Sequence, residues 1–391
     1  LPPLHGIRTC FRDGQVTLRS NRRTDGFTNA LKEHGYQRIH EGDLVIHAMD
    51  AFAGAIGVSD STGKSTPVYS ACVERTPNTV NQYFYAYYLR SLAQSGYLES
   101  LAKGIRERST DFRFTDFAKL VLAFPPLDTQ NAIVRFLDET TAKIDDAIAI
   151  RGRQIAQLKE RKQIITQNAV TIGLSPSVAM KDSGVEWIGR IPAHWGVKRL
   201  KYVAKLNTHS LPEDTDKYFS FRYVDISNVS LENGVEFAQQ MNFADAPSRA
   251  RRLANAGDTV VSTVRTYLKA IAYVDDEKCD YVYSTGFSVI HPNDEIFPEF
   301  LTAFLTSNSF TNQVDVKSKG VSYPAIDSTD LGDLFVTLPP LTEMKSIAGY
   351  LDAVSRSVSK ALSLKASQIE KLREYKETLI KSVVTGKIKV V

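Results

Sequence analysis

The stretch Phe124-Pro-Pro-Leu-Asp-Thr-Gln130 returns 214 residues later as Leu338-Pro-Pro-Leu-Thr-Glu-Met344. From there the two copies align without a gap for more than forty residues. A match of this length indicates an internal structural repeat. Adjacent prolines cannot lie inside a helix, and Asp128 and Thr342, just behind them, are good N-cap residues. Each copy is therefore predicted to start one long helix.

Apolar residues in both copies recur at alternating steps of four and three, with one extra step of four. This spacing is typical of a nearly regular coiled-coil seam. A basic residue interrupts the seam at the same two places in each copy, Arg151 and Lys162 in the first and Lys365 and Lys376 in the second. The residues predicted to form the interface between the helices are Ile144, Ile148, Ile155, Leu158, Val358, Leu362, Ile369 and Leu372.

A helix of some forty residues is roughly 60 Å long, which one small domain cannot bury. Antiparallel pairing of the two copies would bury both seams and keep the connections short. The alternative, in which each helix packs on its own domain, explains the matching lengths less well. We therefore expect a rod with one globular head at each end and a pseudo-two-fold axis between them.

The heads precede the helices. The expected domains are a first head at 1–127, a first helix at 128–174, a second head at 175–337 and a second helix at 338–391. Gly42-Asp43 and Gly257-Asp258 open similar β-rich runs, and Ala55-Ile56 matches Ala270-Ile271 at the same offset. The runs 42–46, 259–264 and 281–290 are predicted strands, and 83–92 and 298–305 are predicted short helices. We expect mixed α/β heads of similar fold and divergent sequence.

The second head opens with a segment, 181–195, whose counterpart in the first head would fall before residue 1. The chain also begins with leucine and not with methionine. The first head is therefore expected to lack some thirty N-terminal residues, because the sequence is trimmed or because this head is naturally short.

The composition is that of an ordinary globular protein, with 391 residues, 43% hydrophobic and 24% charged, so long disorder is not expected. The longest apolar stretches, such as 120–127, are too short for a membrane span. Cys10, Cys72 and Cys279 lie far apart, which fits a reducing cytoplasm and argues against a structural metal site. The net charge of +4 means that a nucleic-acid role would need local basic patches.

No catalytic motif is complete. Gly63-Lys64-Ser65 resembles the end of a phosphate-binding loop, but that motif requires glycine at the position of Val58, so a polar turn is expected. The repeated Pro-Pro pairs lack the flanking side chains of amino-methyltransferase motifs. The histidines are scattered without metal-ligand spacing. We therefore expect no catalytic residue, no metal and no cofactor.

The sequence resembles that of the specificity subunit of type I restriction–modification systems along nearly the whole chain. The most specific elements are Asp-Ser-Gly-Val-Glu-Trp-Ile-Gly-Arg-Ile-Pro-Ala-His-Trp at 182–195, the repeated Pro-Pro-Leu helices, and the ending Leu-Ile-Lys-Ser-Val-Val-Thr-Gly-Lys-Ile at 379–388. The resemblance implies two mixed α/β target-recognition domains joined by two long antiparallel coiled-coil helices. One departure from the family pattern is the missing start of the first head.

The resemblance further implies a non-catalytic subunit that reads two short half-sites in double-stranded DNA, with the helices as the ruler for the spacer between them. Its implied partners are two copies of an adenine-N6 methyltransferase (modification) subunit, which dock on the helices, and a translocating restriction subunit.

DNA contacts require Arg, Lys and small polar groups on loops. In the second head these groups gather in the loops 262–269 and 317–323. In the first head, 47–52 and 103–109 occupy the corresponding places, although 47–52 contains no arginine or lysine. Further basic clusters lie at 22–23 and 249–252. The residues predicted to contact DNA are Arg106, Arg108, Arg265, Lys269, Lys317, Lys319, Ser322 and Tyr323.

Two alternatives stay open. The chain could be a reader for another restriction architecture, in which nuclease and methyltransferase share one partner chain, or a coiled-coil adaptor with protein-binding heads and no DNA role. A nuclease acting alone is disfavoured because the sequence lacks a convincing acidic metal cluster.

Overall fold

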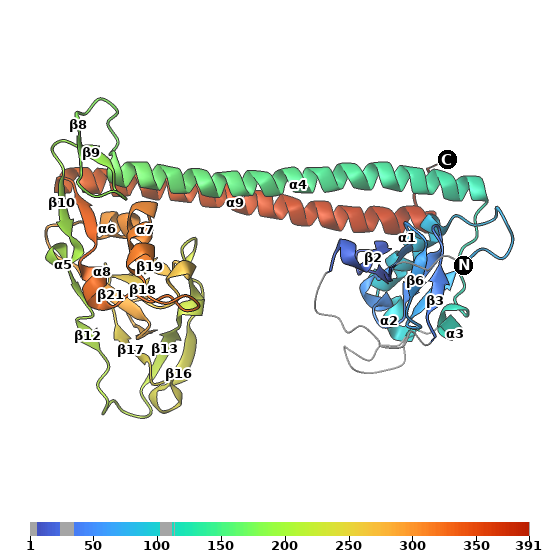
Figure 1. Ribbon diagram of the computed structural model, residues 1–391, viewed down its shortest axis with the longest axis horizontal. Helices are drawn as coiled ribbons and strands as arrows, with labels where there is room; N and C mark the ends of the chain where they lie inside the picture. The colour runs from blue at the N-terminus through green and yellow to red at the C-terminus, as the bar shows by residue number, and fades with distance from the viewer. Residues whose placement is uncertain (1–5, 24–34, 102–111, 113, 391) are drawn as a thin grey trace. The chain divides into compact units, whose positions relative to one another are not determined.

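The structure is a computed structural model that describes residues 6–23, 35–101, 112 and 114–390 (Figure 1). The chain forms two compact units. Unit 1 consists of Leu1–Arg153 and Lys365–Val391, and unit 2 of Gln154–Leu364. Two long helices, α4 (Leu127–Thr171) and α9 (Leu341–Val384), each contribute one part to each unit.

The two long helices run antiparallel, as predicted. In unit 1 the first half of α4 shares a core with the last turns of α9, and the buried members are Ile133, Val134, Leu137, Ile144, Leu379, Val383 and Val384. In unit 2 the end of α4 shares a core with the start of α9, through Ala169, Val170, Met344 and Ile347. Because the beginning of one helix packs on the end of the other, the seams face each other.

The N-cap prediction for Asp128 and Thr342 is wrong by two residues. The carbonyl of Pro126 already accepts the N–H of Gln130 at 3.0 Å, and the carbonyl of Pro340 accepts the N–H of Met344 at 3.0 Å. Each second proline therefore occupies the cap position, where its missing N–H leaves no helical hydrogen bond unmade. Asp128 and Thr342 lie in the first turn instead.

The head of unit 1 is built on a three-stranded antiparallel sheet in the order β5-β4-β7, with two further strand pairs, β1-β2 and β3-β6. The strands are β1 (Arg8–Cys10), β2 (Val16–Leu18), β3 (Gln37–Ile39), β4 (Leu44–His47), β5 (Ile56–Val58), β6 (Gly63–Ser65) and β7 (Tyr69–Cys72). The helices are α1 (Gln82–Gln94), α2 (Tyr97–Leu101), α3 (Phe114–Phe117) and the short 3₁₀ helices η1 (Arg19–Asn21) and η2 (Ala51–Ala53).

The head of unit 2 has a four-stranded sheet, β11-β21-β18-β19, and a five-stranded sheet, β12-β17-β20-β13-β16. The strands of these sheets are β11 (Ala204–Leu206), β12 (His209–Ser210), β13 (Ser220–Val224), β16 (Gln239–Asn242), β17 (Ala250–Leu253), β18 (Thr259–Ser262), β19 (Ile271–Tyr273), β20 (Tyr281–Ser284) and β21 (Phe287–Pro292). The two-stranded pairs are β8 (Met180–Asp182) with β9 (Arg190–Pro192), β10 (Gly196–Arg199) with β22 (Phe335–Leu338), and β14 (Val229–Ser230) with β15 (Gly234–Val235).

The helices of this head are α5 (Leu200–Val203), α6 (Pro298–Leu305), α7 (Asn308–Lys317) and α8 (Ser328–Gly332), with the 3₁₀ helices η3 (Ile226–Asn228), η4 (Phe243–Asp245) and η5 (Thr266–Leu268).

Both heads have the same layers. In unit 1, α1 shares a core with β4 and β5 on one side and with α4 and α9 on the other. In unit 2, α6 and α7 share a core with β18, β19 and β21 and with the same two long helices. In each head a short helical layer thus lies between one sheet, β5-β4-β7 or β11-β21-β18-β19, and the long helices (Figure 1). The mixed α/β prediction is confirmed for both heads.

The predicted strand at 281–290 is two strands, β20 and β21, divided at Thr285-Gly286 and belonging to different sheets. The predicted polar turn at Gly63-Lys64-Ser65 is the strand β6, paired with β3. The predicted helices at 83–92 and 298–305 are confirmed as α1 and α6.

The segment 182–195, which carries much of the family resemblance, attaches the second head to the start of α9. Trp195 is buried, and its ring N–H donates to Oε2 of Glu343 at 2.9 Å. His194 Nε2 lies 2.7 Å from Oε1 of the same carboxylate. Trp187 is only partly buried, and its carbonyl accepts the hydroxyl of Ser309 at 2.8 Å. The segment therefore holds the head against the first turn of α9.

Candidate nucleic-acid interface

One loop occupies the same place in both heads. In unit 2 it follows β18, passes through η5 and enters β19, and in unit 1 it follows β4, passes through η2 and enters β5. In each head the first strand pairs with the second and with one further strand, β21 or β7. The sequences of the two loops align at a constant offset, so Asp50 corresponds to Arg265 and Gly54 corresponds to Lys269.

In unit 2 this loop presents Arg265 to solvent. Arg265 and Lys269 flank η5, and both have left-handed backbone conformations, with φ of 51° and 48°. Non-glycine residues adopt this conformation rarely and at an energetic cost. The side chain of Arg265 is exposed and that of Lys269 is half-buried.

The second predicted loop of unit 2 packs directly against the first. Lys319 and Ala325 exchange backbone hydrogen bonds of 2.8 and 2.9 Å, which closes a hairpin at 319–325. Ala325 also bridges to Val264, and the Thr266 hydroxyl lies 3.0 Å from that of Ser318. The loops 262–269 and 317–325 thus form one surface, which we call the unit 2 loop pair.

The contact that joins the two loops at the surface is between Arg265 and Tyr323. The guanidinium carbon of Arg265 lies over the Tyr323 ring, 5.4 Å from its centre. Such a cation–π contact orients a guanidinium that remains accessible. Tyr323, Ser322 and Lys317 are exposed. Two predicted DNA-contact residues from separate loops are therefore held together.

Lys319 is also exposed, but its ammonium lies 3.1 Å from the carboxylate of Asp330. The hydrogen bond to Asp330 raises the pKa of Lys319 above its usual range. Part of its charge is thereby balanced within the protein. Three exposed neighbours on the same surface, Tyr267, Leu268 and Val321, lie in the two predicted loops but were not among the predicted contact residues. Their only signal in the sequence is their position beside the basic residues.

The predicted DNA contacts of the second loop of unit 1, Arg106 and Arg108, lie outside the described residues. The first loop of unit 1 is described, and it forms one wall of a pocket of about 520 Å³. The pocket is lined by Thr9, Cys10, Phe11, Arg12, Asp13, Arg19, Arg22, Arg23, His47, Asp50 and Tyr69. Of its four arginines, sequence reasoning singled out only Arg22 and Arg23.

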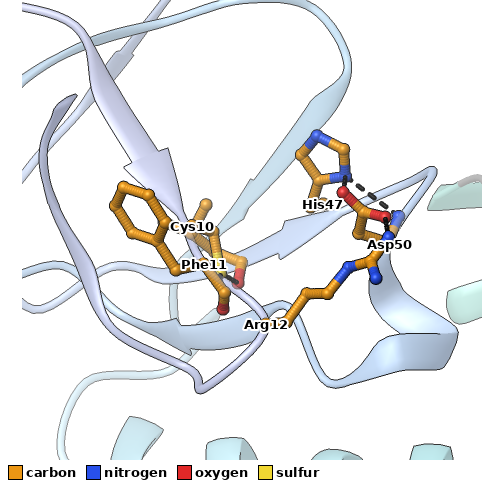
Figure 2. A network of polar contacts seen from close by, with 6 residues as sticks. Cys10, Phe11, Arg12, His47 and Asp50 are labelled. Atoms are coloured by element: carbon orange, nitrogen blue, oxygen red, sulfur yellow. Dashed lines mark hydrogen bonds and ion pairs between the residues drawn. The ribbon is translucent and has the colours of Figure 1, made fainter. Parts of the chain in front are cut away.

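Two arginines of this pocket are fixed by carboxylates. Arg12 Nη2 lies 2.9 Å from Oδ1 of Asp50, as Figure 2 shows. Arg22 Nη1 lies 2.6 Å from Oδ2 of Asp13, and its guanidinium stacks over Phe11 at 4.4 Å. Asp50 is itself fixed, because its N–H donates to Nδ1 of His47 at 2.9 Å. The loop, which contains no basic residue of its own, thus receives Arg12 from the β1–β2 hairpin.

Burial lowers the pKa of His47, and the nearby Arg12 lowers it further, against an opposing effect of Asp50. His47 is therefore neutral at pH 7, which suits its acceptance of the Asp50 N–H. Burial raises the pKa of the Cys10 thiol to about 12, so this cysteine is protonated and unreactive. The pocket therefore offers guanidinium groups as hydrogen-bond donors, and its cysteine, Cys10, does not act as a nucleophile.

The arginine cluster of unit 2 at 249–252 is engaged within the head. Arg249 pairs with Asp225 at 3.3 Å, and the Arg251 guanidinium lies 4.6 Å from the centre of the Phe243 ring. Within the described ranges, no group of three or more His, Cys, Asp or Glu side chains is placed to hold a metal ion. The same part of the chain contains no helix long and apolar enough to span a bilayer.

The eight residues predicted for the helix interface are all at least half shielded from solvent. Ile144 is buried and the other seven, Ile148, Ile155, Leu158, Val358, Leu362, Ile369 and Leu372, are half-buried. The basic residues within the seam are half-buried as well, and Lys376 forms two contacts of 2.7 Å with the Asp145 carboxylate.

Two α/β heads on a shared helix pair, each bringing an arginine to the same loop, define a helix-scaffolded nucleic-acid-recognition protein. Residues 192–371 match the family model of the type I restriction modification DNA specificity domain. The chain resembles the specificity subunits of type I restriction–modification systems, in agreement with the family predicted from its residues. It is a DNA-recognition subunit and not a catalytic one.

Individual relatives agree with this likeness. The MjaVIII specificity subunit of Methanocaldococcus jannaschii is 24% identical, over 90% of this chain and 80% of the relative. Among solved structures, the HsdS subunit from Thermoanaerobacter tengcongensis matches with a TM-score of 0.53 and 16% identity, over 90% of this chain and 82% of that one. A chain from a structural study of complex assembly and conformational transition in a type I system matches with a TM-score of 0.69 and 15% identity, over 89% and 83%. These structural likenesses concern the fold.

Proposed function

We propose that this subunit reads a bipartite target in double-stranded DNA, with residues 1–127 and 175–337 as the two target-recognition domains. The observation that carries the proposal is the unit 2 loop pair, in which Arg265 is oriented by Tyr323 and remains open to solvent. An arginine fixed in this way suits bidentate hydrogen bonding to a base edge, the commonest specific contact in the major groove.

The remaining residues of the loop pair have complementary roles. Lys317 and Lys269 are cations suited to phosphate contacts, which position the protein without reading sequence. The hydroxyls of Ser322 and Tyr323 can hydrogen-bond to phosphates or base edges. Lys319, which is paired with Asp330, contributes a weaker phosphate contact. Arg106 and Arg108 remain proposed contacts of the first domain.

The long helices would serve as ruler and docking site. We propose that two adenine-N6 methyltransferase subunits bind α4 and α9 and that a restriction and translocation subunit joins them, in the cytoplasm. In support, the outer surfaces of the helices expose apolar side chains, and two of these, Ile150 and Leu364, occupy equivalent positions in the repeat. Two equivalent apolar sites suit two copies of one partner.

The test is methylation sequencing at base resolution. A methylation-free host would carry this gene with its neighbouring methyltransferase gene, and the methyltransferase alone would be the control. We expect a bipartite motif bearing N6-methyladenine only when both genes are present. Arg265→Ala is expected to relax or abolish recognition of one half-site, at about 1–3 kcal/mol per lost base contact, while the subunits still assemble. Loss of assembly would refute the assignment of this loop.

A second measurement separates a reader from a protein-binding adaptor. DNA affinity of the assembled complex should fall steeply with salt, because each neutralised phosphate releases counterions. Affinity that does not respond to salt, together with no methylation motif, would favour the adaptor.

A further inference from the structure

The two heads carry opposite charges at one loop position. The residue before the 3₁₀ helix of the loop is Arg265 in unit 2 and Asp50 in unit 1. The residue after it is Lys269 in unit 2 and Gly54 in unit 1, both with positive φ. The loop of unit 1 thus has the same place between two paired strands as the loop of unit 2, but it contains no cation of its own.

The β1–β2 hairpin of unit 1 is seated on this loop by two glycines. A Cβ on Gly54 would lie 2.8 Å from the carbonyl oxygen of Arg12, and a Cβ on Gly57 would lie 1.8 Å from that of Gly14. Only glycine allows the two backbones to approach so closely. Arg12 is therefore delivered to the loop by a specific backbone contact, and its position does not depend on a flexible side chain alone.

Asp50 holds the arginine that arrives there. Its carboxylate accepts from Arg12 at 2.9 Å, and its carbonyl accepts the N–H groups of Ala53 at 3.0 Å and Ala55 at 3.1 Å. Two-thirds of the Arg12 side chain is nevertheless exposed. Among the residues that the structure describes, one ion pair engages part of the guanidinium, which has five N–H donors, so donors remain for a ligand.

We propose that Arg12 is the base-reading arginine of the first domain, the counterpart of Arg265, and that it binds the edge of a guanine in the half-site read by unit 1. Asp50 is its positioning residue, as Tyr323 is for Arg265 in unit 2. This inference rests on the proposed function and names the base class that the first domain recognises. Guanine is the base whose O6 and N7 accept two hydrogen bonds from one guanidinium.

The experiment compares motifs methylated by the complete complex with its methyltransferase. We expect the unchanged protein to prefer guanine at one position of one half-site by on the order of 10- to 100-fold. Arg12→Ala and Arg12→Lys should both lose this preference. Lysine keeps the charge and lacks the planar fork, so loss in both variants indicates base reading. Asp50→Asn should weaken the same position, by a smaller factor, and no other.

Arg75→Ala, an exposed arginine of unit 1 outside the pocket, is the matched control and should leave the motif unchanged. Thermal unfolding of each variant tests whether the fold is retained. A uniform drop in methylation that Arg12→Lys restores would identify a phosphate contact and overturn guanine reading. An unchanged motif in Arg12→Ala, or a half-site without guanine, would overturn it as well. If Arg265→Ala also changes neither half-site, the proposed function itself has failed.

Discussion

At the scale of single residues, the two heads hold an arginine at the same loop by different contacts. In unit 2 the loop supplies Arg265 itself, and the aromatic ring of Tyr323 orients it from a neighbouring hairpin. In unit 1 the same position is Asp50, which accepts an arginine from the β1–β2 hairpin. In both heads an exposed guanidinium is thus held at this loop, by an aromatic ring in one and by a carboxylate in the other.

The depressed pKa of His47 leads to a pH prediction. An unfolded histidine takes up a proton near pH 6.5, whereas the folded His47 does so at lower pH. The stability of unit 1 that depends on neutral His47 is therefore present above pH 6.5 and lost as the pH falls, by at most about 1.4 kcal/mol per pH unit. His47→Asn, which keeps an acceptor for the Asp50 N–H, should show a smaller loss between pH 7.5 and 5.5.

Hydrogen exchange of amides in β4 and β5 is a suitable measurement, because it reports on unit 1 separately. An equal loss in the unchanged protein and in His47→Asn would show that other groups titrate in this range and that His47 does not contribute.

At the scale of elements, the buried ring N–H of Trp195 has its partner on α9. Glu343→Ala would leave that donor unpaired in the core, which is expected to lower the free energy of unfolding by about 1–3 kcal/mol. Glu343→Gln retains an acceptor and should lose less than about 1 kcal/mol. Both tryptophans, Trp187 and Trp195, belong to unit 2, so fluorescence during urea unfolding reports on that unit. Equal losses in the two variants would contradict the hydrogen-bond argument.

The two sides of α4 offer a matched pair of isoleucines. Ile144 is 7% exposed in the seam and Ile150 is 42% exposed on the outer surface. Ile144→Ala should lower the free energy of unfolding by about 2–4 kcal/mol through lost burial and a cavity. Ile150→Ala should change it by about 0.5 kcal/mol or less but weaken assembly with the methyltransferase. Urea unfolding and size-exclusion chromatography of the mixed subunits measure the two effects. Normal assembly of Ile150→Ala would argue against docking at this site.

At the scale of the whole molecule, the proposed ruler predicts a change in target spacing. One heptad inserted at equivalent places in α4 and α9 would lengthen the helix pair by about 10 Å. The spacer between half-sites should then grow by about three base pairs, given a rise of about 3.4 Å per base pair. Methylation sequencing gives the spacer directly. Methylation with the original spacer would refute the ruler.

The sequence by itself determined the elements whose signals are local or periodic. The Pro-Pro pairs, the repeated seam and the helices α1 and α6 were predictable because each depends on residues close together in the chain. The pairing of the two helices followed from the repeat, since a partner helix of equal length buries both seams, and its antiparallel direction followed from the chain order, which keeps the connections short. Charge and hydroxyl content also indicated the loops 262–269 and 317–323, although not that Tyr323 would lie over Arg265.

Tertiary structure alone decided what depends on approach between distant segments. The division of 281–290 into two sheets was not predictable, because both strands are apolar and the turn at Thr285-Gly286 is short. The residues next to Arg12 in the sequence do not mark it as a binding residue, and the loop that it contacts contains no cation. The contact between them exists because Gly54 and Gly57 admit the backbone of the β1–β2 hairpin, some forty residues earlier. Such a contact depends on tertiary packing, which leaves no periodic pattern in the sequence.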